Sequence, residues 1–199
     1  MANNLTFHPG SVSASDRTVL LKQKGVTIWF TGLSASGKST VACALEKILL
    51  HQGKFTYRLD GDNIRLGLNK DLAFDAISQA ENVRRIGEVA KLFTDACCIT
   101  LVAFISPFRV AREAVRRLHE AAGLGFIEVF VDAPLSVVEQ RDPKGLYKKV
   151  HAGEIQDFPG ISLPYEAPEN PQVHLRTAEC NVAESVEAIT EYLMTHHYL

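Results

Sequence analysis

The sequence predicts an α/β protein, a three-layer αβα sandwich built on a mainly parallel β-sheet. Short apolar and β-branched runs alternate with longer segments in which apolar residues recur at helical spacing. A glycine-rich loop follows the first apolar run and precedes the first helical segment. Alternating strands and helices form parallel sheets with helices on both faces. At 199 residues, the whole chain (1–199) is expected to be a single domain.

The expected strands are short and largely apolar, and the run over residues 99–105 is apolar enough to be covered on both faces. The strands are expected over residues 26–31, 55–59, 99–105, 126–132 and 173–175. The helices are expected over residues 39–51, 79–98, from just after Pro107 to about Ala122, and 182–194.

Two helix starts have sequence signals. Ser78 is expected to be the N-cap of the helix over residues 79–98, with Glu81 completing a capping box. Ser106 has two interpretations. It ends a strand and caps the next helix ahead of Pro107, or it contacts or accepts phosphate.

Charge and composition exclude several classes of protein. The net charge is −2, so no global basic field favours a nucleic acid polymer. Basic residues cluster locally, and the Arg116-Arg117 pair is interpreted as a solvated helix face. No apolar run approaches the roughly 20 residues that span a membrane, and no secretory signal is evident. The four cysteines fit neither paired disulfides nor zinc spacing, so a reduced, cytoplasmic location is expected.

Two segments differ from the rest of the chain. Residues 1–20 are expected to form an N-terminal arm, polar and irregular over residues 1–16. Residues 142–170 are rich in Lys, Gly and Pro and have weak periodicity. This second segment is interpreted as a mobile lid, because phosphoryl transfer requires exclusion of water. The alternative is an ordinary surface excursion.

The glycine-rich loop carries the clearest functional signal. Residues 32–39 fit the template G-x-x-x-x-G-K-[S/T], in which backbone N–H groups hold phosphate. Lys38 can reach the β- and γ-phosphates, and the Ser39 hydroxyl can hold Mg²⁺. The strand–loop–helix context is typical of the P-loop NTPase type of sandwich and disfavours a chance match. The ATP-binding residues are expected to be Gly32, Leu33, Ser34, Ala35, Ser36, Gly37, Lys38, Ser39 and Thr40.

A second set of polar residues follows the next strand. Ligands of open parallel sheets bind beyond the carboxyl ends of the strands, which places Asp60-Gly61-Asp62 opposite the phosphate loop. Asp62 could accept a proton from an attacking hydroxyl or orient a Mg²⁺-bound water. Arg65 could bind an anionic group of the acceptor. The alternative is a simple Asp-Gly turn. Phe74 and Phe158 lie in polar surroundings, and each either stacks on a ligand base or fills a local apolar gap.

Several further segments resemble adenylylsulfate kinase (APS kinase), most closely its fungal, single-domain members. The resemblance extends from about Leu20 to Leu193. Its segments are Gly-Leu-Ser-Ala-Ser-Gly-Lys-Ser-Thr from Gly32, Leu-Asp-Gly-Asp-Asn-Ile-Arg from Leu59, Gly-Leu-Asn-Lys-Asp-Leu from Gly67, Glu-Asn-Val-Arg-Arg-Ile from Glu81, Phe-Ile-Ser-Pro from Phe104, Glu-Gln-Arg-Asp-Pro-Lys-Gly-Leu-Tyr-Lys-Lys from Glu139 and Pro-Tyr-Glu-Ala-Pro from Pro164.

The resemblance implies transfer of the ATP γ-phosphoryl group to the 3′-hydroxyl of adenosine 5′-phosphosulfate (APS), with Mg²⁺, in a homodimer. Lys38 and Ser39 would serve ATP and Mg²⁺, and Asp62 would be the base or metal organiser. Ser106 matches a position named as a phosphoserine in some bacterial members, although direct in-line transfer needs no such intermediate. The APS pocket would be lined by Asp62, Arg65, Phe74, Gln79, Asn82, Ile105, Ser106, Lys144 and Phe158.

One departure from the family pattern concerns the acceptor. The family usually has Asp-Arg where this chain has Ser78-Gln79, so Gln79 lacks the charge of an arginine that contacts APS. Altered APS affinity, or altered inhibition by excess APS, is therefore expected. Two other functions stay open: a P-loop kinase for another small hydroxylated acceptor, and a nucleotide-binding regulatory relative without catalysis.

Overall fold

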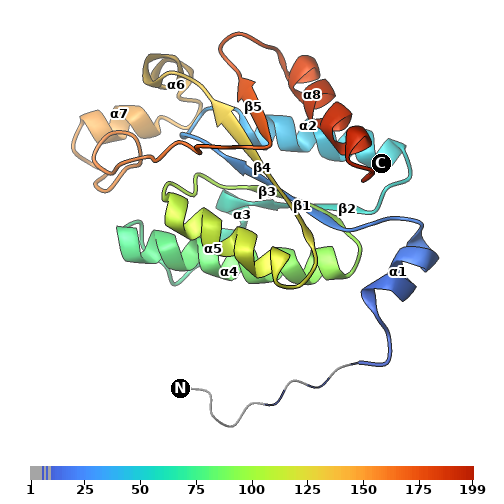
Figure 1. Cartoon of the computed structure of the whole chain (residues 1–199). Coiled ribbons are helices and arrows are strands. Elements are labelled where there is room, and N and C mark those ends of the chain that lie inside the picture. The colour runs from blue at the N-terminus through green and yellow to red at the C-terminus, as the bar shows by residue number, and fades with distance from the viewer. Residues whose placement is uncertain (1–5, 7, 9) are drawn as a thin grey trace.

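One parallel sheet organises the computed structural model, which describes residues 6, 8 and 10–199. Its strand order is β2-β3-β1-β4-β5 (Figure 1). The strands are β1 (Val26–Thr31), β2 (Thr56–Asp60), β3 (Ile99–Ala103), β4 (Gly125–Asp132) and β5 (Val173–Arg176). The helices are α1 (Ala14–Leu21), α2 (Lys38–His51), α3 (Gly61–Arg65), α4 (Ala76–Asp95), α5 (Arg109–Glu120), α6 (Leu135–Arg141), α7 (Leu146–His151) and α8 (Val182–Thr195).

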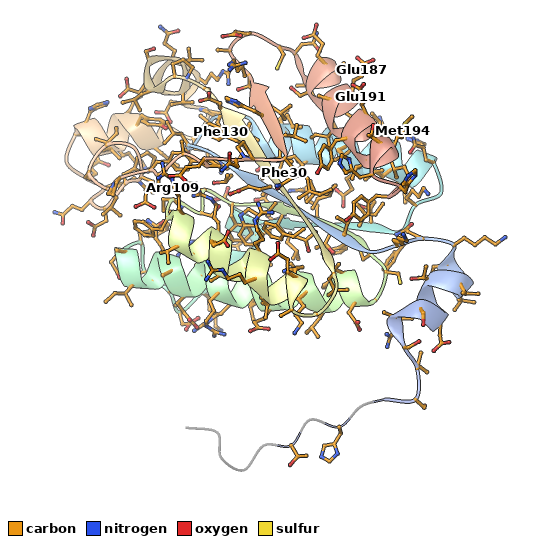
Figure 2. The ribbon with its side chains drawn as sticks, viewed as in Figure 1. Phe30, Arg109, Phe130, Glu187, Glu191 and Met194 are labelled. Atoms are coloured by element: carbon orange, nitrogen blue, oxygen red, sulfur yellow. The ribbon has the colours of Figure 1, made fainter. Side chains whose placement is uncertain are left out.

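Helices cover both faces of the sheet, which confirms the predicted αβα sandwich. Helices α2 and α8 pack on one face, and α4 and α5 pack on the other (Figure 1). Exposed Glu187 and Glu191 project from the outer side of α8 (Figure 2). No helix in the described part of the chain has the length and apolar character needed to cross a membrane.

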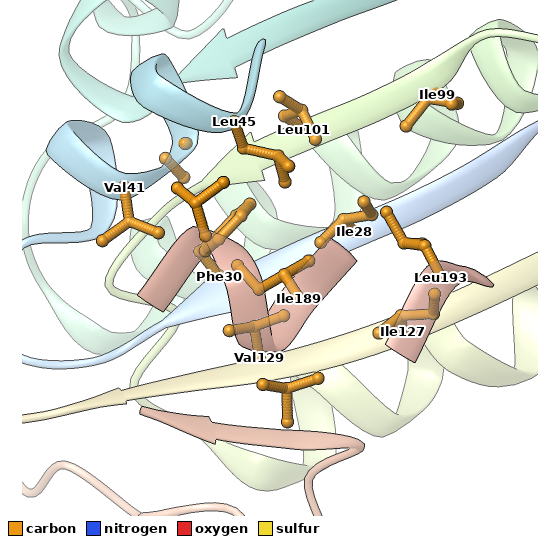
Figure 3. Packing of buried hydrophobic residues seen from close by; sticks show 14 of the residues in the cluster. Ile28, Phe30, Val41, Leu45, Ile99, Leu101, Ile127, Val129, Ile189 and Leu193 are labelled. Atoms are coloured by element: carbon orange, nitrogen blue, oxygen red, sulfur yellow. The ribbon is translucent and has the colours of Figure 1, made fainter. Parts of the chain in front are cut away.

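The central strand β1 supplies side chains to both halves of the core, because successive residues of a strand face opposite sides. Ile28 and Phe30 pack with Leu45 of α2 and Ile189 of α8 (Figure 3). Trp29 points to the other face and packs in a second cluster, with residues of α4 and α5. Complete burial of β1 fixes the position of the phosphate loop that follows it.

The predicted start of α4 is wrong. Asp75, not Ser78, is the N-cap, and its carboxylate accepts hydrogen bonds from the backbone N–H groups of Ile77 and Ser78. Glu81 is engaged instead by Arg84 and Arg85, which hold its pKa at about 2. The helix also ends at Asp95 rather than residue 98, because the chain reverses at residue 97 with φ 64° before entering β3.

Of the two interpretations of Ser106, the one as a helix cap is wrong, because α5 begins at Arg109 with Phe108 as its N-cap. Residues 14–16, expected to be irregular, belong to α1, where Ser13 and Asp16 form a capping box. The remaining expectation for the N-terminal arm falls partly on residues 1–5, 7 and 9, which lie outside the described residues. The short helices α3, α6 and α7 are not predicted from the sequence.

A buried histidine links α5 to β1 and predicts a pH-dependent stability. His119 donates from Nδ1 to the Val115 carbonyl and accepts at Nε2 from the Thr27 hydroxyl, at 2.9 Å each. Burial lowers the pKa of His119 below that of an exposed histidine. On acidification the unfolded chain therefore takes up this proton first, and stability is lost as the pH falls through and below about 6.5.

We expect His119→Gln to remove this pH dependence. The wild type should be more stable than the variant at pH 7, and the difference should be smaller at pH 5. Urea unfolding at both pH values measures it, with the exposed His51→Gln as the control for replacing a surface histidine. An equal difference at pH 5 and pH 7 would contradict the assignment.

Candidate functional site

A large cleft of about 1320 Å³ lies at the carboxyl ends of the central strands. The phosphate loop, the α3 region, the end of β3 and the segments around residues 141–146 and 154–159 surround it. Every site residue predicted from the sequence lines this cleft except Gly32 and Leu33, the first two residues of the phosphate loop. The fold therefore brings the expected nucleotide and acceptor residues to one place.

The phosphate loop has the backbone conformation that its glycines permit. Gly32 has φ +153°, and an added Cβ would lie 2.3 Å from the Val131 carbonyl oxygen. Gly37 has φ +105° and is the N-cap of α2. The N-terminus of α2 therefore opens onto the cleft, with its free N–H groups and partial positive charge available to an anion. The buried Ser36 hydroxyl in the same loop has no partner among the described residues.

Lys38 is buried against this loop. Its ammonium donates to the carbonyl oxygens of Gly32 at 3.0 Å and Leu33 at 2.6 Å. Burial and, to a lesser extent, the charge of Lys144 lower the pKa of Lys38 to about 7, and Asp60 and Asp62 act in the opposite direction. A buried cation of this kind is stabilised by anionic oxygens, which a polyphosphate supplies.

Two aspartates face the phosphate loop from the end of β2. The Asp60 carboxylate accepts from the Asp62 backbone N–H at 3.2 Å and from Arg58 at 2.7 Å. It thereby caps the short helix α3, so Gly61 starts a helix rather than a simple turn. The Asp62 side chain is exposed in the cleft and forms an ion pair with Lys144.

Arg65 and Phe74 form one unit on the side of the cleft built by α3 and the segment before α4. Arg65 donates from Nη1 to the carbonyl oxygens of Leu72 and Ala73, at 3.0 Å each. Its guanidinium carbon lies 4.2 Å from the centroid of the Phe74 ring. Phe74 is 62% exposed, so it does not fill an apolar gap. Gln79 donates to the Phe74 carbonyl at 2.9 Å, which ties this aromatic residue to α4.

Phe158 differs from Phe74. It is 6% exposed and packs edge-on against Tyr147 of α7, with ring centroids 5.1 Å apart. Phe158 therefore fills an apolar gap in the described structure, and it also contributes to the cleft lining.

Ser106 is held from inside the protein. The residue is 3% exposed and has φ +41°, and its hydroxyl accepts from the Trp29 indole N–H at 3.0 Å. Its carbonyl accepts from Arg112 at 2.7 Å. The neighbouring Ile105 carbonyl accepts from the Thr31 hydroxyl at 2.7 Å. These contacts fix the loop after β3 at the floor of the cleft.

Sequence reasoning missed the buried ion pair behind this loop. Arg112 donates to Glu128 at 2.7 Å and to the Glu166 carbonyl at 2.7 Å. Arg116, predicted to be solvated together with Arg117, is instead half-buried and pairs with Glu128 at 3.2 Å. Only Arg117 is exposed as predicted. A carboxylate within a strand, Glu128, is the one sequence signal that could have indicated buried partners.

A second missed pair supports the phosphate loop from outside. The Thr177 hydroxyl donates to the Ser36 carbonyl at 2.7 Å, and Arg141 donates to the Thr177 carbonyl at 2.5 Å. Both residues line the cleft next to the start of α8. Thr177 directly follows β5 and belongs to no motif quoted above, whereas Arg141, the last residue of α6, lies in the family segment from Glu139 but was given no role.

The side chains of this cleft that could act as ligands to a cation bind through oxygen atoms. Ser39, Asp60 and Asp62 line it, and Mg²⁺ prefers hydroxyl, carboxylate and phosphate oxygens. The described residues contain no group of three or more His, Cys, Asp or Glu side chains placed to hold a metal by themselves. This donor set fits a Mg²⁺ ion that is bound mainly through phosphate groups.

Comparison with known proteins gives one consistent family. The family model described as Adenylylsulphate kinase matches residues 24–176. The adenylyl-sulfate kinase of Saccharomyces cerevisiae is 59% identical over 195 residues, covering 98% of this chain and 96% of the relative. The adenylyl-sulfate kinase of Emericella nidulans is 56% identical, covering 97% of this chain and 96% of the relative.

A solved structure agrees with these sequence matches. The Mycobacterium tuberculosis APS kinase, determined in complex with AMPPNP and APS, superimposes with a TM-score of 0.84 at 47% identity. The superposition covers 86% of this chain and 99% of that structure.

Proposed function

This chain belongs to the adenylylsulfate kinase family, and we propose that it transfers the γ-phosphoryl group of ATP to the 3′-hydroxyl of APS. The products are 3′-phosphoadenosine 5′-phosphosulfate (PAPS) and ADP, and the reaction serves sulfate activation and assimilation. The observation that carries this proposal is the shared cleft, in which the phosphate loop faces Asp62, Arg65 and Phe74. In-line phosphoryl transfer needs donor and acceptor positioned face to face in this way.

The donor side binds ATP through the phosphate loop. Backbone N–H groups at the start of α2 and the Lys38 ammonium contact the phosphate oxygens. Ser39, with Asp62, would hold Mg²⁺, which supplies positive charge to the phosphate oxygens when bound. Within the described residues Lys38 has no carboxylate partner and donates to two neutral carbonyls, which supports this role.

The acceptor side binds APS. Phe74, Ile105 and Phe158 supply apolar contacts, while Arg65 and Lys144 supply positive charge for the anionic end of APS. Gln79 and Asn82 supply polar contacts from α4. Asp62 accepts the proton of the attacking hydroxyl or organises the metal.

We propose that Ser106 holds the loop and is not phosphorylated. Its hydroxyl oxygen is buried and bonded to the Trp29 indole, so attack on a phosphate would require that contact to break. Direct transfer from ATP to APS needs no covalent intermediate.

Three wider features stay predictions. Residues 142–170, which carry Lys144 and Phe158, would close over the bound nucleotides as a lid. The homodimer is carried over from the family resemblance. The cytoplasmic location is carried over from cysteine usage.

An acceptor screen tests the proposed function. Purified protein is incubated with ATP, Mg²⁺ and either APS, AMP, a nucleoside or a sugar acid, and ADP and phosphorylated products are measured. We expect turnover with APS, giving PAPS, and little with the other acceptors. ATP binding without turnover on APS would favour a regulatory protein, and turnover on another acceptor would favour a different kinase.

A further inference from the structure

Two asparagine side chains meet behind the acceptor wall of the cleft. Asn82, on α4, lines the cleft and is 8% exposed. Asn69 lies in the segment between α3 and α4 and is 0% exposed. Its Nδ2 donates to Asn82 Oδ1 at 2.7 Å. The buried asparagine is therefore placed to act on a ligand through its partner.

This hydrogen bond decides which end of the Asn82 amide faces the cleft. An asparagine amide has an acceptor oxygen at one end and two N–H donors at the other. Because Asn69 occupies the oxygen of Asn82, the nitrogen end is left for a ligand. Among the described residues, Asn82 makes no other side-chain hydrogen bond.

The reversed arrangement is less favourable. In the observed one, a single buried atom of the pair, Asn69 Oδ1, has no partner among the described residues. Reversing both amides would bury the Asn69 NH₂ group with both donors unpaired. Unpaired buried donors are rarer and more costly than an under-satisfied carbonyl oxygen.

The segment that carries Asn69 is held firmly on α4. Arg85 makes a two-pronged contact with the Asp71 carboxylate, at 2.7 and 2.8 Å. The Asn69 backbone N–H donates to the Ile64 carbonyl at 3.1 Å, and its carbonyl accepts from the Leu72 N–H at 3.2 Å. The Asn69 side chain is thus fixed before any ligand binds, as expected of a residue that orients another.

We infer that Asn69 is a positioning residue that presents Asn82 to APS as a hydrogen-bond donor. This inference rests on the proposed function, because it concerns the acceptor of the same cleft. The atom that Asn82 recognises on the acceptor is then a hydrogen-bond acceptor, such as a ring nitrogen, a ribose oxygen or a phosphate oxygen. Asn69 makes no contact with the ligand itself.

A double-mutant cycle tests the inference. Asn69→Ala is expected to raise the KM for APS about five- to tenfold, the loss of one oriented hydrogen bond, and to leave the KM for ATP unchanged. In an Asn82→Ala background, the same substitution should change the KM for APS less than twofold. Leu68→Ala, a half-exposed neighbour in the same segment, is the control and should match the wild type.

A substitution that keeps the size of Asn69 sharpens the test. At a pH that keeps it ionised, the carboxylate introduced by Asn69→Asp offers only acceptor atoms, so it would attract the Asn82 nitrogen and turn the Asn82 oxygen toward the ligand. We expect a larger rise in the KM for APS than with Asn69→Ala, on the order of tens of fold. Thermal unfolding is measured for each variant. If Asn69→Ala does not fold, Asn69→Ser replaces it in the cycle.

The outcomes separate this inference from the proposed function. Equal effects of Asn69→Ala in both backgrounds, or a smaller effect of Asn69→Asp than of Asn69→Ala, would show a purely structural role. Either result would overturn the inference while wild-type turnover on APS is retained. Failure of the wild type to phosphorylate APS would overturn the proposed function and this inference with it.

Discussion

Lys38→Ala is expected to lower kcat/KM for ATP, with APS as the acceptor, by about 10³-fold. The Lys38 ammonium is buried beside the phosphate loop, where it donates hydrogen bonds to the Gly32 and Leu33 carbonyls. It is therefore available to the charge that develops on the transferred phosphoryl group, in a site where water does not screen it. A coupled assay for ADP release measures the effect, at saturating APS and with ATP varied.

Lys47→Ala is the matched control, because Lys47 is an exposed lysine on the same helix α2. It should retain wild-type rates. A Lys38→Ala variant with folded-state stability intact and kcat/KM within tenfold of the wild type would contradict the proposed role of Lys38.

Asp62→Asn is expected to lower kcat by about 10²–10⁴-fold, with a much smaller change in the KM for ATP. The substitution keeps the shape of the side chain and removes its charge. Asn cannot accept the proton of the 3′-hydroxyl, and it is a weaker partner for Mg²⁺-bound water. It also releases Lys144 from its ion pair. Single-turnover measurement of PAPS formation isolates the chemical step.

Asp95→Asn serves as the control for this change. Asp95 lies at the end of α4 and pairs with Arg17 of α1. Its replacement should leave turnover unchanged. If Asp62→Asn kept kcat within threefold of the wild type, Asp62 would be neither base nor metal organiser.

The sequence predicted those parts of the fold that depend on neighbouring residues. The strand at residues 26–31 was predicted with the bounds that the structure has, because every residue in it is buried in the sheet centre. The start of α4 was predicted wrongly, because Ser78 and Asp75 are both good caps and the sequence does not say which begins the helix. Short helices such as α3 and α7 lack enough residues for a periodic pattern.

The same division applies to the site. The phosphate loop is one contiguous motif, so its residues could be assigned from spacing alone. The contacts that hold the other cleft-lining residues in place join distant positions. Trp29 and Ser106 are separated by 77 residues and Arg112 and Glu128 by 16, and no local pattern pairs them. Sequence reasoning therefore found residues that line the cleft and missed those that hold them in place.

The strand order separates the two halves of the cleft into different modules. The phosphate loop directly follows the central strand β1. Helix α3 and the segment leading to α4 follow β2, which lies at the edge of the sheet. Trp29 of β1 packs against Val83 and Ile86 of α4, whereas Gln79 of the same helix lies in the cleft lining, so a substitution at a cleft-lining position such as Gln79 can leave the packing around β1 intact. We therefore expect that the acceptor preference of this fold can change while its phosphate loop stays the same.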